Sequence, residues 1–341
     1  MKIGIDCRLI NTIQNTGISR YTEFLVKYYI DKYGFDSVIL ISNDFEFKYE
    51  KCKVVYTKLK PFNIFHFFKF SKFVESFNFD LFHVPFYSGL NQKINSTTVV
   101  TVHDLMYKFV EGFFGKNKVL NHLKIKYFDF LVGRSLKNAD KIVAVSETTQ
   151  NDILKIFGFE STHIPEDSEI TVDEDASILA RFDLKVNEFY FYCGNNRPHK
   201  NLEFIIDVFA KNNLKPLVLA GKGHKNYNNV IATGIVTDEE LKSLYKSAKA
   251  FIFPSKYEGF GLPILESLQL ETMVVASNIS AFLEFKSHNI YYFENGSTKD
   301  FLDAVGRTLN NDFIKEDSFF ENYDKKRIYE LNDKMLTDLL N

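Results

Sequence analysis

The stretch Phe251–Leu268, FIFPSKYEGFGLPILESL, decides the fold. It starts as an apolar strand, passes through a turn-rich loop and continues into a helix that Pro263 can start, because proline is favoured in the first helical turn. Such a junction presents free backbone N–H groups and the positive end of a helix dipole. The loop glycines Gly259 and Gly261 leave the approach free of side chains, which suits a phosphate group.

Two carboxylates flank this loop, Glu258 before it and Glu266 one turn into the helix. Both would repel a phosphate, so we expect them to meet neutral hydroxyl groups of the same ligand. A ligand with phosphates in its middle and hydroxyl-rich rings at both ends is a nucleotide sugar. The same residues are also compatible with an ordinary strand–loop–helix unit that carries two surface glutamates.

The segment from Glu258 to Pro263, followed by Glu266, resembles the Glu-x7-Glu signature of the retaining glycosyltransferases of family four, which have the GT-B fold. This resemblance implies that Glu266 binds the ribose hydroxyls. It also implies that Glu258 binds the sugar and stabilises positive charge at the anomeric carbon. The backbone N–H groups expected to bind the diphosphate are those of Gly259, Phe260, Gly261 and Leu262.

A second loop, Gly194–Asn201, follows an apolar strand and contains two cations, Arg197 and Lys200. Cations between a strand and a helix are suited to a diphosphate, although they also fit a solvated surface. By resemblance, Lys200 matches the family lysine that binds the donor diphosphate. Asn195 stands where the family often has its arginine, and Arg197 is expected to substitute for it.

The first half of the chain carries two further segments of the family. Gly17-Ile18-Ser19-Arg20-Tyr21 is similar to the family's Gly-Ile-Gly-Arg-Tyr loop over the donor phosphates, with Ser19 in place of the second glycine. His103 ends the β-branched strand Thr97–Val102, where open α/β sheets bind ligands. The resemblance implies that His103 lies against the transferred sugar. In the second half, it implies that Gly234 and Val236 meet the nucleotide base.

Strands and helices alternate along the chain, which predicts an α/β protein with two Rossmann-like domains and a cleft between them. An acidic segment near Pro165 predicts the boundary. We expect an acceptor-side domain at 1–165, a nucleotide-sugar-binding domain at 166–317 and a helix at 318–341 that returns to the first domain. Ser318 is the expected N-cap of that helix.

Composition favours a reduced, cytosolic protein. The chain has 341 residues and three dispersed cysteines, which is neither a disulfide framework nor a zinc spacing. Its start reads as a strand without a signal peptide, and no apolar run is long enough to span a bilayer. We expect no metal, no cofactor besides the donor substrate and no nucleic-acid partner.

Charge is distributed unevenly. Residues 1–165 carry 22 Lys and Arg against 16 Asp and Glu, an excess of +6, whereas the remainder carries 20 against 28, or −8. The run Lys58–Phe79 also mixes lysines with phenylalanines, as interfacial helices do. An amphipathic helix packed on the core has the same pattern, so both a peripheral membrane contact and a core helix remain open.

The sequence therefore predicts a retaining, hexosyltransferase-type glycosyltransferase that moves a sugar from a nucleoside-diphosphate sugar to a hydroxyl acceptor. By resemblance, the acceptor is a glycan or lipid-linked glycan in bacterial surface polysaccharide or lipopolysaccharide assembly, at the inner face of the cytoplasmic membrane. Two alternatives fit the same residues, namely a nucleotide-sugar epimerase and a non-catalytic nucleotide-sugar-binding subunit. The donor sugar, its base, the linkage and the oligomeric state are not encoded in any motif.

Overall fold

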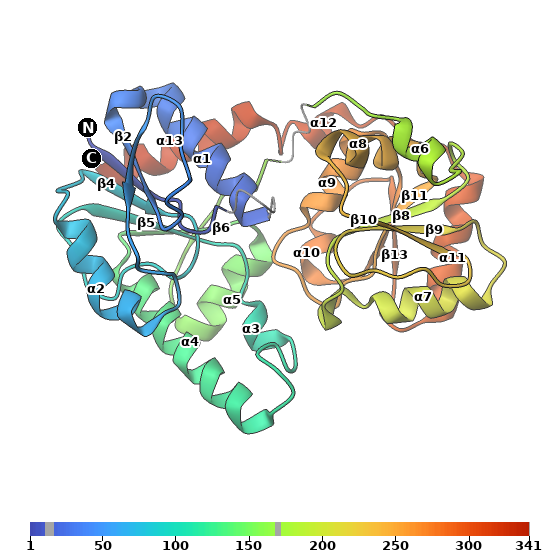
Figure 1. Cartoon of the computed structure of the whole chain (residues 1–341), viewed down its shortest axis with the longest axis horizontal. Helices are drawn as coiled ribbons and strands as arrows, with labels where there is room; N and C mark the ends of the chain where they lie inside the picture. Colours follow the sequence, from blue (N-terminus) through green and yellow to red (C-terminus); the bar gives the residue numbers. More distant parts are fainter. Residues whose placement is uncertain (11–16, 168–171, 341) are drawn as a thin grey trace. The chain divides into compact units, whose positions relative to one another are not determined.

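The computed structural model describes residues 1–10, 17–167 and 172–340. The chain forms two compact units, one made of Met1–Asp167 with Lys325–Asn341 and the other of Ser168–Asp324. Each unit is a parallel β-sheet with helices packed against it (Figure 1). Because parallel strands are buried on both faces, their sequences are nearly continuous apolar runs, and these runs were the basis of the α/β prediction.

Unit 1 has a seven-stranded sheet in the order β3-β2-β1-β4-β5-β6-β7. The strand bounds are β1 Ile3–Asp6, β2 Val38–Ser42, β3 Lys53–Tyr56, β4 Leu81–Val84, β5 Thr97–Val102, β6 Lys141–Ala144 and β7 Thr162–His163. Its main helices are α1 Gly17–Tyr33, α2 Ile64–Glu75, α4 Lys118–Asn138 and α5 Glu147–Phe157, with the single-turn α3 Met106–Phe109 before α4. Ser146 caps α5 by accepting from the Thr149 N–H, and Gly158 ends it in the left-handed conformation.

Unit 2 has a six-stranded sheet in the order β10-β9-β8-β11-β12-β13. The strand bounds are β8 Tyr190–Cys193, β9 Leu217–Ala220, β10 Val230–Gly234, β11 Ala250–Phe253, β12 Val274–Ser277 and β13 Ile290–Phe293. The helices are α6 Ser177–Arg181, α7 Leu202–Lys211, α8 Asp238–Ser247, α9 Leu262–Gln269, α10 Ser280–Leu283, α11 Thr298–Asn310 and α12 Asp317–Phe320.

The last segment of the chain returns to the first unit, as predicted. Helix α13, Lys325–Leu340, places Ile328, Met335 and Leu336 in the core that also contains Ile3 and Leu25. The predicted single helix from Ser318 is wrong, however. Ser318 lies inside α12, whose N-cap is Glu316, and Phe319 packs against Tyr323 of the same unit at 5.2 Å between ring centroids. Phe319 is buried, and the chain turns through residues 321–324 before α13 begins.

Both sheets reverse their strand order at one point, between β1 and β4 in unit 1 and between β8 and β11 in unit 2. Strands on the two sides of such a point send their following helices to opposite faces, so the loops at their carboxyl ends diverge. Ligands of open α/β sheets bind in the space that this divergence leaves. The loops after these four strands are therefore the candidate positions for a ligand-binding site.

Candidate active site

The two strands that flank the reversal in unit 2 bring the predicted residues Lys200 and Glu258 together. Lys200 follows β8 and Glu258 follows β11, and Nζ of the lysine lies 2.6 Å from Oε1 of the glutamate. The side chains are 15% and 13% exposed, and the ammonium lies 5.1 Å from the centre of the Phe253 ring. The sequence assigned these residues to different parts of a ligand, whereas the structure joins them in an ion pair at the ligand-binding end of the sheet.

Glu266 is buried on α9, one turn behind the loop. Its Oε2 accepts a hydrogen bond of 2.9 Å from the Tyr245 hydroxyl, which in turn lies 2.9 Å from Sγ of Cys193. Burial raises the pKa of Tyr245 well above its ordinary value, so the hydroxyl keeps its proton and can donate. The sequence reasoning missed Tyr245, because its place on the buried face of α8 resembles that of any core aromatic residue.

The turn into α9 requires a glycine for packing, a reason other than the open approach to a phosphate that was predicted from the sequence. A Cβ atom on Gly261 would lie 2.8 Å from the Phe285 ring, so no larger residue fits there without movement. Phe260 is buried, with its ring 5.3 Å from that of Phe285, and its side chain therefore belongs to the core. Only the backbone of Phe260 is left for a ligand, which agrees with the role predicted for it. Helix α9 starts at Leu262, with Pro263 in its first turn.

The part of the loop Gly194–Asn201 that precedes Lys200 is more exposed to solvent. Arg197 and Asn195 are exposed, and Oδ1 of Asn195 accepts from the Arg197 backbone N–H at 3.2 Å. The His199 carbonyl accepts from the Lys256 N–H at 2.7 Å, which ties the loop after β8 to the loop after β11. Lys200, the residue next to His199, is thereby held opposite the Glu258 loop.

Three glycines join the loops on the other side of β8. The Gly221 N–H donates to the Gly234 carbonyl at 2.8 Å, and a Cβ atom on Gly221 would lie 2.1 Å from the Gly194 carbonyl oxygen. These loops follow the neighbouring strands β10, β9 and β8. Gly234 and the half-buried Val236 therefore lie along the same edge of the sheet as Gly194.

In unit 1, His103 follows β5 and has a protein partner at each ring nitrogen. Nε2 lies 2.8 Å from the Pro85 carbonyl, which can only accept, and Nδ1 lies 2.5 Å from Oε1 of Glu166. Burial alone would lower the pKa of His103, but the Glu166 carboxylate opposes this and the net effect is a raised pKa. An imidazolium donating to both oxygens satisfies this geometry.

Glu166 was missed as a site residue because its segment was predicted to be an acidic linker. It is in fact buried directly after β7, where its carboxylate reaches His103. A glutamate beside Pro165 in a stretch of acidic residues carries no local sign of burial. Recognising Thr162–His163 as a strand would have placed Glu166 at the carboxyl edge of the sheet.

The glycine segment of unit 1 lies close to His103. Gly17 begins α1, and the Tyr21 ring meets the His103 ring edge-on at 4.7 Å between centroids. The Ser19 hydroxyl donates to the Leu9 carbonyl at 3.2 Å, so the side chain that replaces the family glycine is turned inward. The residues just before this segment, Asn15 and Thr16, lie outside the described residues.

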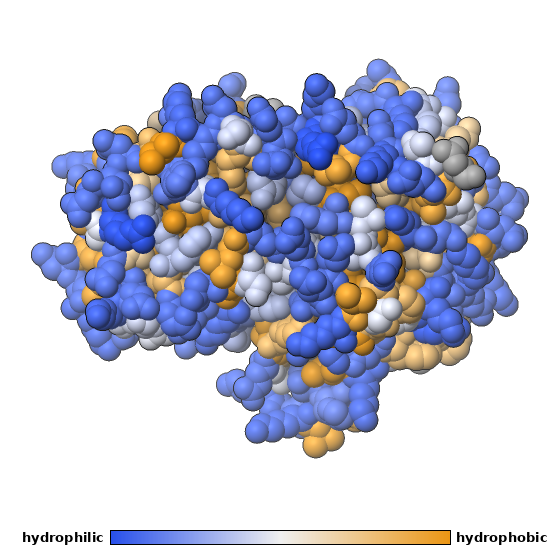
Figure 2. All heavy atoms as spheres, turned by 180° about the vertical axis from the view of Figure 1, so that it is seen from behind, coloured by the Kyte–Doolittle hydropathy of each residue, from blue (hydrophilic) through white to orange (hydrophobic). Residues whose placement is uncertain are grey.

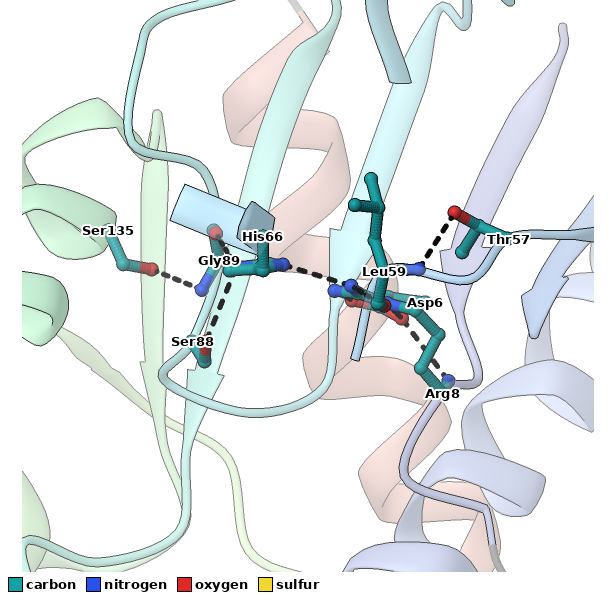
Figure 3. A network of polar contacts seen from close by, with 8 residues as sticks. All are labelled: Asp6, Arg8, Thr57, Leu59, His66, Ser88, Gly89 and Ser135. Carbon is teal, nitrogen blue, oxygen red and sulfur yellow. Dashed lines mark hydrogen bonds and ion pairs between the residues drawn. The ribbon is translucent and has the colours of Figure 1, made fainter. Parts of the chain in front are cut away.

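A buried polar network closes the strand ends at the reversal of unit 1 (Figure 3). Arg8 donates to both carboxylate oxygens of Asp6, at 2.7 and 2.6 Å, and both side chains are fully buried. The guanidinium also lies 2.9 Å from Nδ1 of His66, whose Nε2 lies 3.1 Å from the Gly89 carbonyl. Burial and the neighbouring Arg8 charge lower the pKa of His66 to about 3, so His66 is neutral and Nδ1 is the acceptor.

Comparison with protein families finds a similarity to glycosyltransferases in each half of the chain. The family "Glycosyl transferases group 1" matches residues 180–327, and "Glycosyltransferase Family 4" matches residues 16–165. Each half of the chain is thus similar to a family of glycosyltransferases. The O-antigen chain mannosyltransferase B of Escherichia coli is 26% identical over 215 residues, which cover 54% of this chain and 54% of that protein. The match thus spans about half the length of this curated relative.

Solved structures show the same fold. The sucrose-phosphate synthase of Thermosynechococcus elongatus superposes with a TM-score of 0.79 at 17% identity over 99% of both chains. The Anabaena protein HepE, in complex with UDP-glucose, superposes with a TM-score of 0.73 at 14% identity over 99% of this chain and 100% of that one. The predicted GT-B architecture, an α/β fold of two Rossmann-like units, is therefore confirmed.

Proposed function

We propose that the chain transfers a sugar, with retention of the anomeric configuration, from a nucleoside-diphosphate sugar to a hydroxyl acceptor. The observation that carries this proposal is the Lys200–Glu258 pair beside the start of α9, at the strand reversal of unit 2. This arrangement offers a cation and backbone N–H groups to a diphosphate, and a carboxylate to the sugar attached to it. The bound UDP-glucose of HepE supports a donor of this class.

Each residue has a separate role in this proposal. Lys200 and Arg197 stabilise the negative charge on the departing diphosphate, together with the N–H groups at Gly259–Leu262. Glu266, oriented by Tyr245, accepts from the ribose hydroxyls. Glu258 accepts from the sugar hydroxyls and stabilises positive charge that grows at the anomeric carbon.

The reaction breaks the bond from the anomeric carbon to the diphosphate oxygen and forms a bond from that carbon to the acceptor oxygen on the same face. The acceptor proton passes to the departing phosphate oxygen. We propose that this charge change needs no metal and no further cofactor, because the cations and the helix dipole already oppose the developing negative charge. Turnover that persists in a chelator is the expected result, and loss of turnover that magnesium or manganese restores would contradict it.

The acceptor is proposed from the relatives. An O-antigen chain mannosyltransferase among them favours hexosyl transfer to a glycan or lipid-linked glycan during surface polysaccharide or lipopolysaccharide assembly. Such acceptors are made at the inner face of the cytoplasmic membrane, so we propose a cytoplasmic location. Among the helices of the described residues, none is both long and apolar enough to cross a bilayer.

The division of labour between the glutamates tests the proposal. Glu266→Gln should weaken the binding of UDP or GDP, whichever the wild type binds more tightly, as well as the binding of the sugar donor. Glu258→Gln should keep the free nucleotide bound and lower turnover, with calorimetry and product analysis as the measurements. Equal loss of nucleotide binding in both variants would contradict the assignment of Glu266 to ribose and Glu258 to sugar.

Product analysis also separates the alternatives. An epimerase would convert the donor without an acceptor, and a non-catalytic binding subunit would bind the donor without turning it over. Nuclear magnetic resonance of the product reports the anomeric configuration. An inverted product would contradict the retaining mechanism while leaving glycosyl transfer intact.

A further inference from the structure

Two helices of unit 1 carry an exposed apolar and basic surface that neither sheet packing nor the proposed chemistry uses. On α2, the exposed residues Phe65, Phe68, Lys69 and Lys72 are spaced as i, i+3, i+4 and i+7, which places them on one stripe. The buried residues His66, Phe70 and Val74 form the opposite stripe at intervals of four. Helix α2 is therefore divided, with one side in the core and one side of phenylalanines and lysines outside.

The sequence left open whether Lys58–Phe79 forms a core helix or an interfacial one. The structure shows that α2 has one face packed on the core and one face of exposed phenylalanines and lysines. Phe70 is 1% exposed, whereas Phe65 and Phe68 are 61% and 60% exposed. Exposing two phenylalanines in one stripe is costly for a free surface, since each could have been polar at no cost to the core. Lys69 lies with its Nζ 5.7 Å from the centre of the Phe65 ring, so cation and ring share the stripe.

Helix α4 continues this surface. Its buried residues all lie in the second half, from Leu131 onward, and its first half points apolar side chains into solvent. The exposed ones in the first half are Val119, Leu120 and Leu123, and Phe130 in the second half is exposed as well. The Phe67 and Phe130 rings lie 5.1 Å apart, so α2 and α4 are neighbours. Figure 2 shows the orange and blue residues interleaved over the lower lobe, where the start of α4 lies in Figure 1.

The charge on this surface has one sign. Residues 58–74 and 116–128 contain eight lysines and neither aspartate nor glutamate. All eight are exposed: Lys58, Lys60, Lys69, Lys72, Lys116, Lys118, Lys124 and Lys126. We call the exposed side chains of these two segments, with Phe130, the Phe–Lys face. A symmetric contact of this face with the same face of a second copy would bring like charges together, so charge complementarity favours an acidic partner.

We propose that the Phe–Lys face docks on an anionic lipid bilayer. Lysines beside an anionic leaflet are attracted to it, and the phenylalanine and leucine side chains can enter the headgroup boundary. The proposed function gives a reason for a membrane, since a lipid-linked acceptor is confined there. The docking itself needs neither donor nor acceptor, and it can therefore be tested separately.

Cosedimentation with vesicles tests the docking on the full chain. Binding is expected to phosphatidylcholine vesicles that contain phosphatidylglycerol and to be much weaker with phosphatidylcholine alone. Salt at about 1 M, where the screening length falls to about 3 Å, should release the protein. Folded wild-type chain that leaves anionic vesicles unbound at low salt would overturn the proposal.

Two variants separate the contributions of charge and apolar contact. The combined changes Lys69→Glu, Lys72→Glu, Lys118→Glu and Lys124→Glu should lower vesicle partition by at least about tenfold. The pair Phe68→Ser and Leu123→Ser should lower it as well, because apolar insertion is lost. The matched control is Leu154→Ser with Lys155→Glu, an exposed apolar residue and an exposed lysine on α5 of the same unit. The control should bind vesicles like the wild type.

Measuring nucleotide binding by the same variants distinguishes failure of the membrane proposal from failure of the proposed function. All variants should bind UDP or GDP like the wild type, which also shows that they fold. Variants that bind vesicles as well as the wild type would overturn the Phe–Lys face while leaving the glycosyltransferase proposal intact. Self-association that the Phe68→Ser and Leu123→Ser pair abolishes, without vesicle binding, would assign the face to a second copy and overturn the membrane partner.

Discussion

Unit 1 and unit 2 each have a charged pair beside the point where the strand order reverses, but the two pairs differ in their exposure to solvent. At the reversal of unit 1, the Asp6–Arg8 pair is fully buried, and at that of unit 2, the Lys200–Glu258 pair keeps 15% and 13% of its side chains exposed. The Asp6–Arg8 pair lies at the end of one strand, β1, whereas Lys200 and Glu258 follow two different strands, β8 and β11. Only in unit 2 do the charges remain within reach of a solute.

This difference shows that the same strand order can hold a buried pair that stabilises the fold or a partly exposed pair that a ligand could reach. In unit 1, guanidinium, carboxylate and imidazole satisfy one another, and the Arg8 group lies 3.5 Å from the centre of the Phe70 ring. That site is filled by the protein itself. In unit 2, the proposed binding of a diphosphate by Lys200 would require the ion pair to open or to be shared, so the stability of the pair would work against that binding.

The largest expected effect comes from breaking the filled site. Arg8→Met removes the charge partner of Asp6 and leaves a carboxylate buried alone, which should cost about 3–5 kcal/mol in the free energy of unfolding. Denaturant unfolding measures it. Combining Arg8→Met with Asp6→Leu should recover part of the loss, because no unpaired charge remains. A loss below about 1 kcal/mol for the single variant would mean that the pair is not structural.

Acid should lower the stability that the buried His66 contributes to unit 1. The pKa of His66 is lowered to about 3 in the folded chain, so the unfolded chain takes up a proton below about pH 6.5 that the folded chain refuses. Stability contributed by neutral His66 is therefore present above pH 6.5 and falls by up to about 1.4 kcal/mol per pH unit toward pH 3. His66→Asn should flatten this slope relative to the wild type. An imidazole resonance of His66 that titrates near pH 6.5 would contradict the assignment.

The sequence predicted the parts of this comparison that depend on short segments. Gly259, Gly261 and Pro263 lie within one strand–loop–helix junction, which indicated an anion-binding turn. Lys200 was found in the same way, from cations between a strand and a helix. The role of Glu266 came from the resemblance to the family signature. The apolar runs gave the two sheets, because parallel strands are buried on both faces.

The missed residues depend on contacts between distant segments. Glu166 reaches His103 across 63 positions, and Tyr245 reaches Glu266 across 21. No local pattern distinguishes a buried glutamate in an acidic segment, or a hydrogen-bonding tyrosine on a helix, from their ordinary counterparts. Arg8 and His66 were overlooked for the same reason, since their partners come from three separate parts of the chain.

The open site should respond in binding and not in folding. Lys200→Ala should weaken the binding of UDP or GDP by about 1.5–3 kcal/mol, because a charge-assisted contact to the diphosphate is lost. Its effect on unfolding should be far smaller than that of Arg8→Met, since Glu258 remains near solvent. Isothermal calorimetry and denaturant unfolding on the same variant make the comparison. Unchanged affinity would exclude Lys200 from the diphosphate site.

The His103–Glu166 pair has the opposite pH dependence to His66. Because the folded-state pKa of His103 is raised, its contribution is fully present below about pH 6.5 and is lost as the pH rises through the folded pKa. Glu166→Gln removes the carboxylate and should lower the pKa of His103, measured by its imidazole resonances. The stability difference between wild type and Glu166→Gln should then shrink from pH 6 to pH 9. A difference that grows with pH would contradict an imidazolium at this position.

The smallest effect, and the most discriminating, concerns the pair in unit 2. If Glu258 holds Lys200 at 2.6 Å in the unliganded chain, a diphosphate must compete with that carboxylate for the ammonium. Glu258→Gln keeps the size and the hydrogen-bonding oxygen but removes the competing charge. It should therefore tighten the binding of free UDP or GDP by up to about 1 kcal/mol, the range of a partly solvated ion pair. The gain should vanish in the Lys200→Ala background, because no ammonium is left to release. Calorimetry on the four proteins of this cycle gives the coupling directly. Weaker nucleotide binding in Glu258→Gln would show that the glutamate orients Lys200 for the diphosphate instead of competing for it.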